Sequence, residues 1–471
     1  NNPSKYSYKY EYDAYNNLTK AISESDIEVK FNYDTTNRGN ITSSTVEKIG
    51  YDNKLYSSMT YTSNGNYIDK VTNNRGKITD YNYNTTNGLL ESVKDPNGNQ
   101  TAYKYNSQND ILEYVYLDAN KNNIMDAGEI NNRYVYTNRR LSRIDHNNFS
   151  YNFIYDTFGN TSAIKVGTQN LISHSYNGYN GKINKSTYGN GFYTENVYDK
   201  LERITGIKNN GTLDFEWKYD NLGFVTSHID NVNGVTYDYE YDTTGRLIRS
   251  ESSKGTTKLL SSETDYDSSN RVTKQTYKFG TSTAKNYTYT YLSDNRINKV
   301  TLPTGASIKP TYDHLGRYTE KQLCTTPQCT SNLKETYTYV AGSTTTGGTG
   351  ATTTLLEKIS YNGGKNISYT YDNNGNILTI SENGTQKARY EYDALNQLTR
   401  EDNRYLNKTV TYAYDNGGNI LNKKEYAYTT GTLGTVQKTI PYAYTDTNWK
   451  DKLTSYDSQT ITYDAIGNPL S

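Results

Sequence analysis

The chain has 471 residues, and 50 lysine and arginine residues balance 50 aspartate and glutamate residues, so its formal net charge is zero. A neutral chain gives no electrostatic reason to bind nucleic acid or an anionic membrane, and we expect neither partner. No stretch approaches the roughly 18 consecutive apolar residues of a membrane-spanning helix, so no membrane insertion is expected. The 52 tyrosines supply the apolar surface, in a form that suits sheets better than helices.

A Tyr-Asp pair recurs along the chain at intervals of about 21 to 25 residues, or about twice that distance where one copy has degenerated. We call its aspartate the marker. The markers are Asp13, Asp34, Asp156, Asp199, Asp220, Asp242, Asp267, Asp313, Asp372, Asp393, Asp415 and Asp464. Asn84 and Asn106 fill the same slot with an amide. Repeats with this short period predict a repetitive architecture.

Each repeat reads as a β-hairpin. Tyrosines alternate before the marker, as in Tyr237, Tyr239 and Tyr241, which places them on one face of a strand. The marker begins a turn, and its carboxylate can accept a backbone N–H two residues later. Three residues after the marker stands Gly or Asn, the residue types that tolerate positive φ. These residues are Gly159, Gly223, Gly245, Gly316, Gly375, Gly418, Gly467, Asn16, Asn37, Asn270 and Asn396, and Asn295 keeps the position in a poor match that has Leu292 in place of the marker.

Glu202 breaks this rule and predicts either strain or a different turn. A second strand follows each turn and begins with a long polar and an aliphatic residue, as at Arg246 and Leu247. A single hairpin is only marginally stable, so the units are expected to pair edge to edge. The predicted fold is therefore all-β, with one long antiparallel sheet over 1–471 that strand twist coils into a spiral or a partly closed shell.

The segment 118–129 interrupts the repeat and has the spacing of a calcium-binding loop. Ca²⁺ takes six to eight oxygen ligands, which such a loop can provide. The proposed ligands are Asp118, Asn120, Asn122, the carbonyl of Ile124, Asp126 and Glu129. Asn123 stands where glycine normally makes the sharp turn, and asparagine also reaches that conformation. The loop resembles calcium loops of Gram-positive surface repeats, and the alternative is a polar hairpin tip.

Three further features carry less information. Cys324 and Cys329 are the only cysteines, and their spacing leaves a local disulfide and two free thiols both open. The tract 341–354, rich in Gly and Thr, reads as a flexible surface loop inserted between two repeats. The four histidines, His146, His174, His228 and His314, lie far apart, which favours incidental packing roles over catalysis.

The pattern Tyr-x-Tyr-Asp-x-x-Gly-Arg/Asn-Leu/Ile resembles the YD repeat of the rearrangement-hotspot (RHS) family. That family includes bacterial polymorphic toxins, wall-associated proteins, toxin-complex cocoon subunits and the teneurins. The resemblance implies a sheet that spirals into a cocoon around a C-terminal toxin, in a secreted or cell-surface protein of a bacterium, with Gram-positive origin expected. The self-cleavage site and the toxin are not seen in this chain, which starts without an initiator methionine and reads as a segment of a longer protein.

Two other functions compete with a structural role. Catalysis would need carboxylates in differing environments, whereas the markers recur in equivalent turns, so no enzyme activity is expected. A carbohydrate-binding or adhesion module would instead use exposed tyrosine ladders to stack on sugars. The burial of the tyrosine face separates these alternatives, because a face directed at a core or lumen is structural and an open face is available for binding.

Overall fold

The computed structural model describes residues 8–23, 25–36, 39–178, 180–326, 332–447, 449–463 and 468–470. Within these residues the chain forms 39 strands and one short helix. The first strands are β1 Lys9–Tyr12, β2 Leu18–Ile22, β3 Ile27–Tyr33, β4 Ile41–Lys48, β5 Lys54–Tyr61, β6 Ile68–Thr72, β7 Ile78–Tyr83, β8 Leu90–Lys94, β9 Gln100–Tyr105, β10 Leu112–Leu117, β11 Asn131–Thr137, β12 Arg140–His146, β13 Phe149–Tyr155, β14 Thr161–Val166, β15 Gln169–Tyr176, β16 Ile183–Tyr188, β17 Tyr193–Tyr198, β18 Ile204–Asn209, β19 Thr212–Tyr219 and β20 Val225–Asp230. The remaining elements are β21 Val235–Tyr241, β22 Leu247–Lys254, β23 Thr257–Tyr266, β24 Val272–Phe279, β25 Lys285–Tyr291, β26 Ile297–Thr301, β27 Ser307–Tyr312, β28 Tyr318–Cys324, β29 Asn332–Ala341, α1 Thr344–Gly347, β30 Thr352–Tyr361, β31 Asn366–Tyr371, β32 Ile377–Glu382, β33 Thr385–Tyr392, β34 Leu398–Asn403, β35 Lys408–Tyr414, β36 Ile420–Ala427, β37 Val436–Ala443, β38 Ser455–Tyr456 and β39 Gln459–Thr460.

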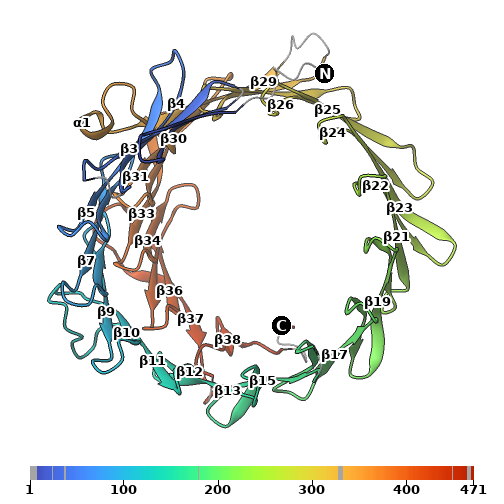
Figure 1. Cartoon of the computed structure of the whole chain (residues 1–471), viewed down its shortest axis with the longest axis horizontal. Coiled ribbons are helices and arrows are strands. Elements are labelled where there is room, and N and C mark those ends of the chain that lie inside the picture. The colour runs from blue at the N-terminus through green and yellow to red at the C-terminus, as the bar shows by residue number, and fades with distance from the viewer. Residues whose placement is uncertain are drawn as a thin grey trace.

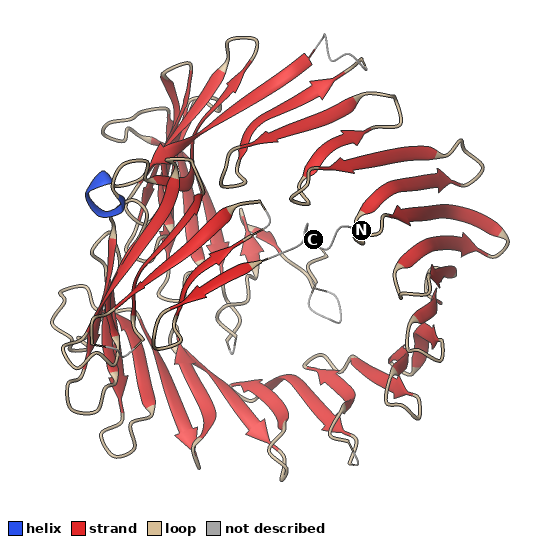
Figure 2. Cartoon of the chain, turned by 45° about the horizontal axis from the view of Figure 1, so that its top comes forward, coloured by secondary structure: helices blue, strands red, loops and turns tan. Residues whose placement is uncertain are grey.

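The strands form one ribbon in which each strand pairs antiparallel with the next strand of the chain. The ribbon curves into an open ring and continues past its own beginning, so that β30 to β36 run beside β5 to β13 (Figure 1). Figure 2 shows the same ribbon as a single layer of strands around an open centre. The predicted all-β spiral of hairpins is confirmed, and the sheet does not close on itself.

A regular bulge gives the ribbon its curvature. In the hairpin of β21 and β22, Glu240 pairs with Arg249 while Tyr241 pairs with Leu247, so Ile248 is an extra residue. The same one-residue shift occurs at the tyrosine before the marker in most other repeats. A bulge bends its strand and increases the local twist. Repetition of the same bulge therefore bends the whole ribbon.

Within the described residues the ribbon is a single layer, and few apolar side chains are fully buried. The buried apolar side chains of the described residues are Ala102, Tyr116, Ala163, Val166, Cys324, Ala388, Val410, Tyr426 and Ile440. Along β21, Tyr237, Tyr239 and Tyr241 are half-buried, whereas Asp238 and Glu240 between them are exposed. The predicted alternation is thus confirmed, and the tyrosines are covered by side chains from neighbouring strands.

The tract 341–354 differs from the predicted irregular loop. It contains the end of β29, the helix α1 and the beginning of β30, and Ser343 caps the helix. The carbonyl of Gly350 accepts a hydrogen bond from Lys54 N–H at 3.0 Å, and a Cβ on Gly347 would lie 3.1 Å from Tyr56 Cβ. The small residues that suggested a loop therefore allow close packing on β5. Sequence composition could not show this, because β5 lies about 290 residues earlier.

Candidate functional site

The marker aspartate organises its turn through backbone hydrogen bonds. Asp242 Oδ1 accepts N–H groups from Thr244 at 2.9 Å and Arg246 at 3.0 Å, and Asp242 N–H donates to Arg246 O at 2.9 Å. The pKa of Asp242 lies well below its ordinary value, chiefly because its carboxylate accepts the Arg246 N–H. The marker is thus a structural acceptor that stays ionised, as the sequence predicted for the turn.

The residue three positions after the marker adopts positive φ, as predicted. Gly245 has a φ of 84° and Asn270 a φ of 64°. Glu202 keeps the same turn with a φ of 64°, so of the two alternatives predicted there, strain is the one observed. Asn37, Asp464 and Gly467, which were also assigned to turns, lie outside the described residues.

A second position in the turn joins each repeat to the next. We call it the bridging position, meaning the residue whose carbonyl accepts the marker N–H. Arg246 occupies it after Asp242: its Nε lies 2.6 Å from Asp242 Oδ2, and its guanidinium stacks 4.7 Å from the Tyr266 ring of the next repeat. Arg246 Nη1 also donates to Asn270 Oδ1 at 2.7 Å. The same stacking on the next repeat is made by Arg203, Arg271, Arg296 and Arg317.

The tyrosine before the marker makes a second joint between repeats. Tyr266 Oη donates to Leu247 O of the preceding repeat at 2.9 Å. Equivalent bonds to a preceding repeat are donated by Tyr33, Tyr61, Tyr155, Tyr176, Tyr198, Tyr219, Tyr241, Tyr291, Tyr312, Tyr339, Tyr371, Tyr392, Tyr414, Tyr444 and Tyr463. In most repeats the hydroxyl of the tyrosine before the turn therefore binds the ribbon itself.

Some turns are one residue longer than the ordinary turn. Asn84 N–H donates to Leu89 O and Asn106 N–H to Ile111 O, five positions on, and the left-handed residues become Gly88 and Asp110. Asn84 and Asn106 therefore do mark turns, as predicted, but the turns are wider. The bridging residue of the first wide turn is Leu89, which has no polar group for the next repeat.

The overlapping parts of the ribbon are joined rim to rim at a seam. Arg75 donates from Nη1 to Asp372 O and from Nη2 to Asn373 O, each at 2.7 Å. Asn97 and Asn373 are also paired, because Asn373 N–H donates to Asn97 Oδ1 at 3.1 Å. The turn between β31 and β32 thus meets the turn between β6 and β7, 25 strands earlier. Burial opposes ionisation of Asp372, but hydrogen bonds from Asn97 and Asn376 hold its pKa below the ordinary value.

A second group of seam contacts lies near the end of the described chain. Asp451 Oδ2 accepts the Tyr151 hydroxyl at 2.9 Å, and Trp449 Nε1 donates to that hydroxyl at 3.0 Å. Burial, followed by the Asp451 hydrogen bond, raises the pKa of Tyr151 to about 12. Asn147 Nδ2 reaches both Asp415 at 2.8 Å and Asp451 at 3.5 Å. The residues that meet at the seam lie 263 to 305 positions apart, and no local pattern of the sequence marked them.

Several solved structures share this architecture at low sequence identity. No protein-family model and no curated protein matches the chain. The crystal structure of TcdB2–TccC3–Cdc42 matches 98% of this chain with a TM-score of 0.53 and 13% identity, and that of TcdB2–TccC3–TEV matches 94% with 0.51 and 13%. The Photorhabdus luminescens Tc holotoxin pore matches 98% with 0.50 and 12%. The chain has the fold of part of TcdB2–TccC3. It covers 27% to 30% of those chains.

The loop 118–129 brings its oxygen-bearing side chains onto one short segment. Asp118 is fully buried, and its Oδ2 accepts Gln100 Nε2 at 2.7 Å and Asn123 N–H at 2.8 Å. Asn123 has a φ of 60°, so asparagine does serve at the sharp turn. Asn120 and Asn122 each donate a side-chain amide to Asp126 Oδ2, at 2.6 and 3.0 Å.

The acidic end of this loop is also bonded within the loop. Glu129 Oε1 accepts Ala119 N–H at 2.9 Å, and Oε2 accepts Asp126 N–H at 3.0 Å. The Ile124 side chain is exposed. Within the part of the chain that the structure describes, no three His, Cys, Asp or Glu side chains gather closely enough to hold a metal ion. The six predicted ligands therefore share one loop. The carboxylates of Asp118 and Glu129 accept backbone N–H groups, and that of Asp126 accepts the side-chain amides of Asn120 and Asn122.

His228, His314 and Cys324 are packed within the ribbon, whereas His146 Nε2 lies 3.5 Å from Asp451 Oδ2 at the seam. His228 stacks between Trp217 and Tyr237, with ring centroids 4.9 and 5.4 Å away, and His314 stacks on Tyr51 at 3.3 Å. Cys324 is fully buried and disulfide-bonded, whereas Cys329 lies outside the described residues. In the described residues no helix is long and apolar enough to cross a membrane.

Proposed function

We propose that this chain is a non-catalytic wall segment of an RHS-type toxin-delivery protein, and that it encloses or presents a C-terminal toxin polypeptide. The observation that carries the proposal is the seam, where a ribbon of hairpins passes one full turn and binds its own earlier rim. Hydrogen bonds between the overlapping rims fix the curvature of the wall, whereas an unpaired sheet edge leaves it free to change. The resemblance of the YD repeats and the structural likeness to TcdB2–TccC3 support the same role.

The chemistry of the tyrosines supports a structural role over catalysis. Burial raises the pKa of Tyr151, Tyr312 and Tyr412 to about 12, which moves these groups away from proton transfer at neutral pH. The marker carboxylates are held ionised by equivalent backbone bonds. We place the protein outside the cell or on its surface, in a bacterium and with Gram-positive origin, because the family resemblance and the calcium-loop pattern belong to such proteins.

Protection of an attached polypeptide tests the proposed function. A protease-sensitive, unfolded polypeptide fused after position 471 should be cleaved more slowly than the same polypeptide free in solution, because the wall limits access. The seam variant Arg75→Ala in the same fusion should restore fast cleavage, and Arg404→Ala, an exposed arginine away from the seam, should not. Cleavage at the free rate in the unaltered fusion would contradict the proposal.

We also propose that the loop 118–129 binds Ca²⁺. Three carboxylates, two amides and the Ile124 carbonyl form a donor set of the kind that calcium prefers. Asp118, Asn120, Asn122, Asp126 and Glu129 would supply the side-chain oxygens once the carboxylates release their N–H partners and the amides rotate. The ion would then cross-link the loop that joins β10 to β11. With three carboxylates, a dissociation constant of about 10⁻⁴ to 10⁻³ M is expected.

Terbium luminescence and thermal unfolding test this site. Tyr116, beside Asp118, should sensitise bound Tb³⁺, and Ca²⁺ should displace it and raise the melting temperature as mass action requires. Asp126→Asn with Glu129→Gln should abolish both effects, while Glu113→Gln on β10 should leave them unchanged. A melting temperature independent of Ca²⁺ and absent sensitised emission would contradict the proposal.

The carbohydrate-binding alternative remains a prediction with less support. The hydroxyl groups of the Tyr-Asp pairs are bonded to the ribbon, and several of their ring faces are covered by arginine. Side chains used in this way have fewer groups left to offer a sugar. Binding on a glycan array that survives substitution of the seam would favour the alternative.

A further inference from the structure

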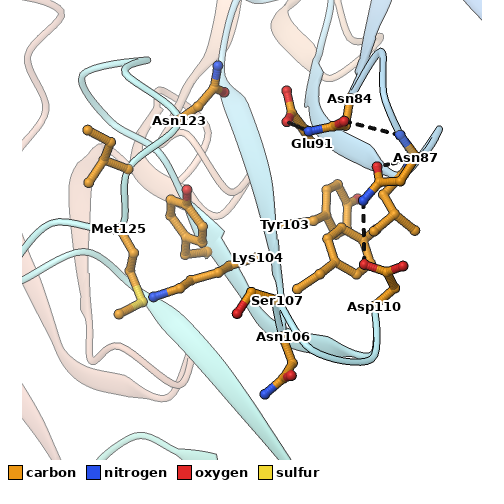
Figure 3. A pocket seen from close by; sticks show the side chains of 14 residues that line it. Asn84, Asn87, Glu91, Tyr103, Lys104, Asn106, Ser107, Asp110, Asn123 and Met125 are labelled. Carbon is orange, nitrogen blue, oxygen red and sulfur yellow. Dashed lines mark hydrogen bonds between the residues drawn. The ribbon is translucent and has the colours of Figure 1, made fainter.

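A pocket of about 410 Å³ lies between the two wide turns that begin at Asn84 and Asn106 (Figure 3). Tyr103, Tyr105 and Tyr116 contribute its aromatic lining, and Glu91 and Asp110 contribute carboxylates. The loop 118–129 also reaches the pocket, through Asn123 to Met125. The two turns beside this pocket are each one residue longer than an ordinary turn, such as the one that begins at Asp242.

In the ordinary pairs whose bridging residue is an arginine, that arginine fills the equivalent space. Arg246 bonds to its own marker carboxylate, stacks on the ring of Tyr266 and donates to Asn270 Oδ1, the left-handed residue of the next turn. Arg271 repeats the arrangement with Asp267, Tyr291 and Asn295. Three kinds of group therefore hold a guanidinium in this fold: a carboxylate, a tyrosine face and an oxygen of the next turn.

The pocket keeps these three kinds of group and lacks the arginine. Its bridging residue is Leu89. Tyr105 corresponds to Tyr266, and no cation stacks on its ring among the described residues. Asp110, with a φ of 57°, corresponds to Asn270 and adds a negative charge to the left-handed position. Glu91 supplies a carboxylate beside the marker, where its Oε1 accepts Asn84 Nδ2 at 2.9 Å and its Oε2 accepts Asn82 Nδ2 at 3.2 Å.

The two carboxylates of the pocket have no cationic partner among the described residues. Neither Glu91 nor Asp110 forms an ion pair within the described ranges, and Asp110 accepts only a long hydrogen bond of 3.4 Å from Asn87 among side chains. Lys104 is the one cationic lining residue, and its ammonium lies beside Met125, away from Asp110 (Figure 3). Tyr116, which is 3% exposed, lines the same pocket, and none of the hydrogen bonds among the described residues involves its hydroxyl. A ligand in the pocket can therefore take this hydroxyl as an additional partner.

We propose that this pocket binds an arginine side chain presented by another polypeptide. The guanidinium stacks on Tyr105 and donates to Asp110 and Glu91, as the bridging arginines do elsewhere in the ribbon. A guanidinium suits the site better than an ammonium, because its planar fork can stack on a ring and serve two carboxylates at once. The inference does not depend on the proposed wall function, since it concerns only groups that line the pocket.

Calorimetric titration of the full chain with N-acetyl-arginine N-methylamide tests the proposal. Binding at one site is expected, and the citrulline analogue, which has the same shape without the charge, should bind at least about tenfold more weakly. Equal binding of the two probes, absence of binding by the arginine probe, or competition by cellobiose would each overturn the proposal.

Variants locate the binding in the pocket. Asp110→Asn, which keeps a residue that tolerates positive φ, and Glu91→Gln should each weaken the arginine probe at least about tenfold. Glu113→Gln, a matched change on β10 where Glu113 pairs with Arg133, should leave the affinity unchanged. Leu89→Arg should restore the internal guanidinium, abolish probe binding and raise the melting temperature. Unchanged affinity in Asp110→Asn and Glu91→Gln, with the fold retained by circular dichroism, would overturn the proposal.

Discussion

Arg75 gives the most direct test of the seam. Its guanidinium makes two hydrogen bonds of 2.7 Å across the seam, to Asp372 O and Asn373 O. A hydrogen bond to a charged group contributes about 1.5–3 kcal/mol to stability. Because the bond from Arg75 to Asn373 O is exposed, we take the lower value, about 1.5 kcal/mol, for each of the two bonds. Arg75→Ala should therefore favour seam opening by about 3 kcal/mol, a change of about 100-fold in the opening equilibrium.

Amide hydrogen exchange measures this opening. Asn97 N–H donates to Asn374 Oδ1 at 3.2 Å and Asn373 N–H donates to Asn97 Oδ1 at 3.1 Å, so both amides are bonded across the seam. Where reclosing is fast, their exchange rates follow the opening equilibrium. Peptides that cover Asn97 and Asn373 should exchange about 100-fold faster in Arg75→Ala, while the ladder of β32 and β33 is unaffected.

Arg404→Ala is the matched control, because Arg404 is exposed and its side chain has no partner among the described residues. Protection at Asn97 and Asn373 that does not change in Arg75→Ala would refute the reasoning. Equal loss of protection in both arginine variants would also refute it, because the effect would then be a general consequence of removing charge.

Three further predictions concern the repeat joints. The marker carboxylates have lowered pKa values, so the stability that they contribute is present above their unfolded pKa of about 3.9 and is lost as the pH falls through their folded values. Circular dichroism should therefore show an intact sheet at about pH 5 and acid unfolding below about pH 4, and a midpoint near pH 6 would instead implicate histidine. Glu202→Gly should raise the melting temperature, because glycine adopts positive φ without strain. Gly223→Ala should lower the stability of the fold by about 1 kcal/mol, because Gly223 has a φ of 93° although the space around it is open. Melting-temperature shifts of the same sign in the two variants would contradict this prediction. Tyr266→Phe should lower the free energy of unfolding in urea by about 1 kcal/mol, because it removes the hydrogen bond to Leu247 O. Tyr10→Phe, at an exposed tyrosine, should leave the free energy of unfolding unchanged. Equal losses in the two variants would argue against the tyrosine joint.

The hairpins and their turns were predictable because their causes are local. Gly245 and Asn270 were assigned to positive φ from their distance to the marker, and both adopt it. The bridging position left a visible signal as well, since a long polar residue such as Arg246 recurs four positions after the marker. Its stacking on the next tyrosine was not predicted, because that contact depends on how neighbouring hairpins pair.

The candidate sites were predictable only in part. The oxygen-rich spacing of 118–129 identified a loop whose donors do share one segment, but not the hydrogen bonds that hold its carboxylates. The pocket beside it was missed, although an extra residue between Asn84 and Leu89 was a readable signal of a wider turn. The tract 341–354 does connect two repeats, but its one-turn helix and its close contact with β5 were not predicted, because small residues suit a close contact as well as a loop.

The sequence by itself determined the repeating unit, since alternation, turn chemistry and positive φ act over a few residues. Only the tertiary structure decided the radius of the ring and the partners at the seam. Each bulged hairpin adds a small bend. The seam forms where those bends have accumulated over about 25 strands, between residues that lie 263 to 305 positions apart in the sequence. A small change in the bend of each hairpin would bring different rims together, so the partners of Arg75 and Asp451 could not be identified from the residues around them.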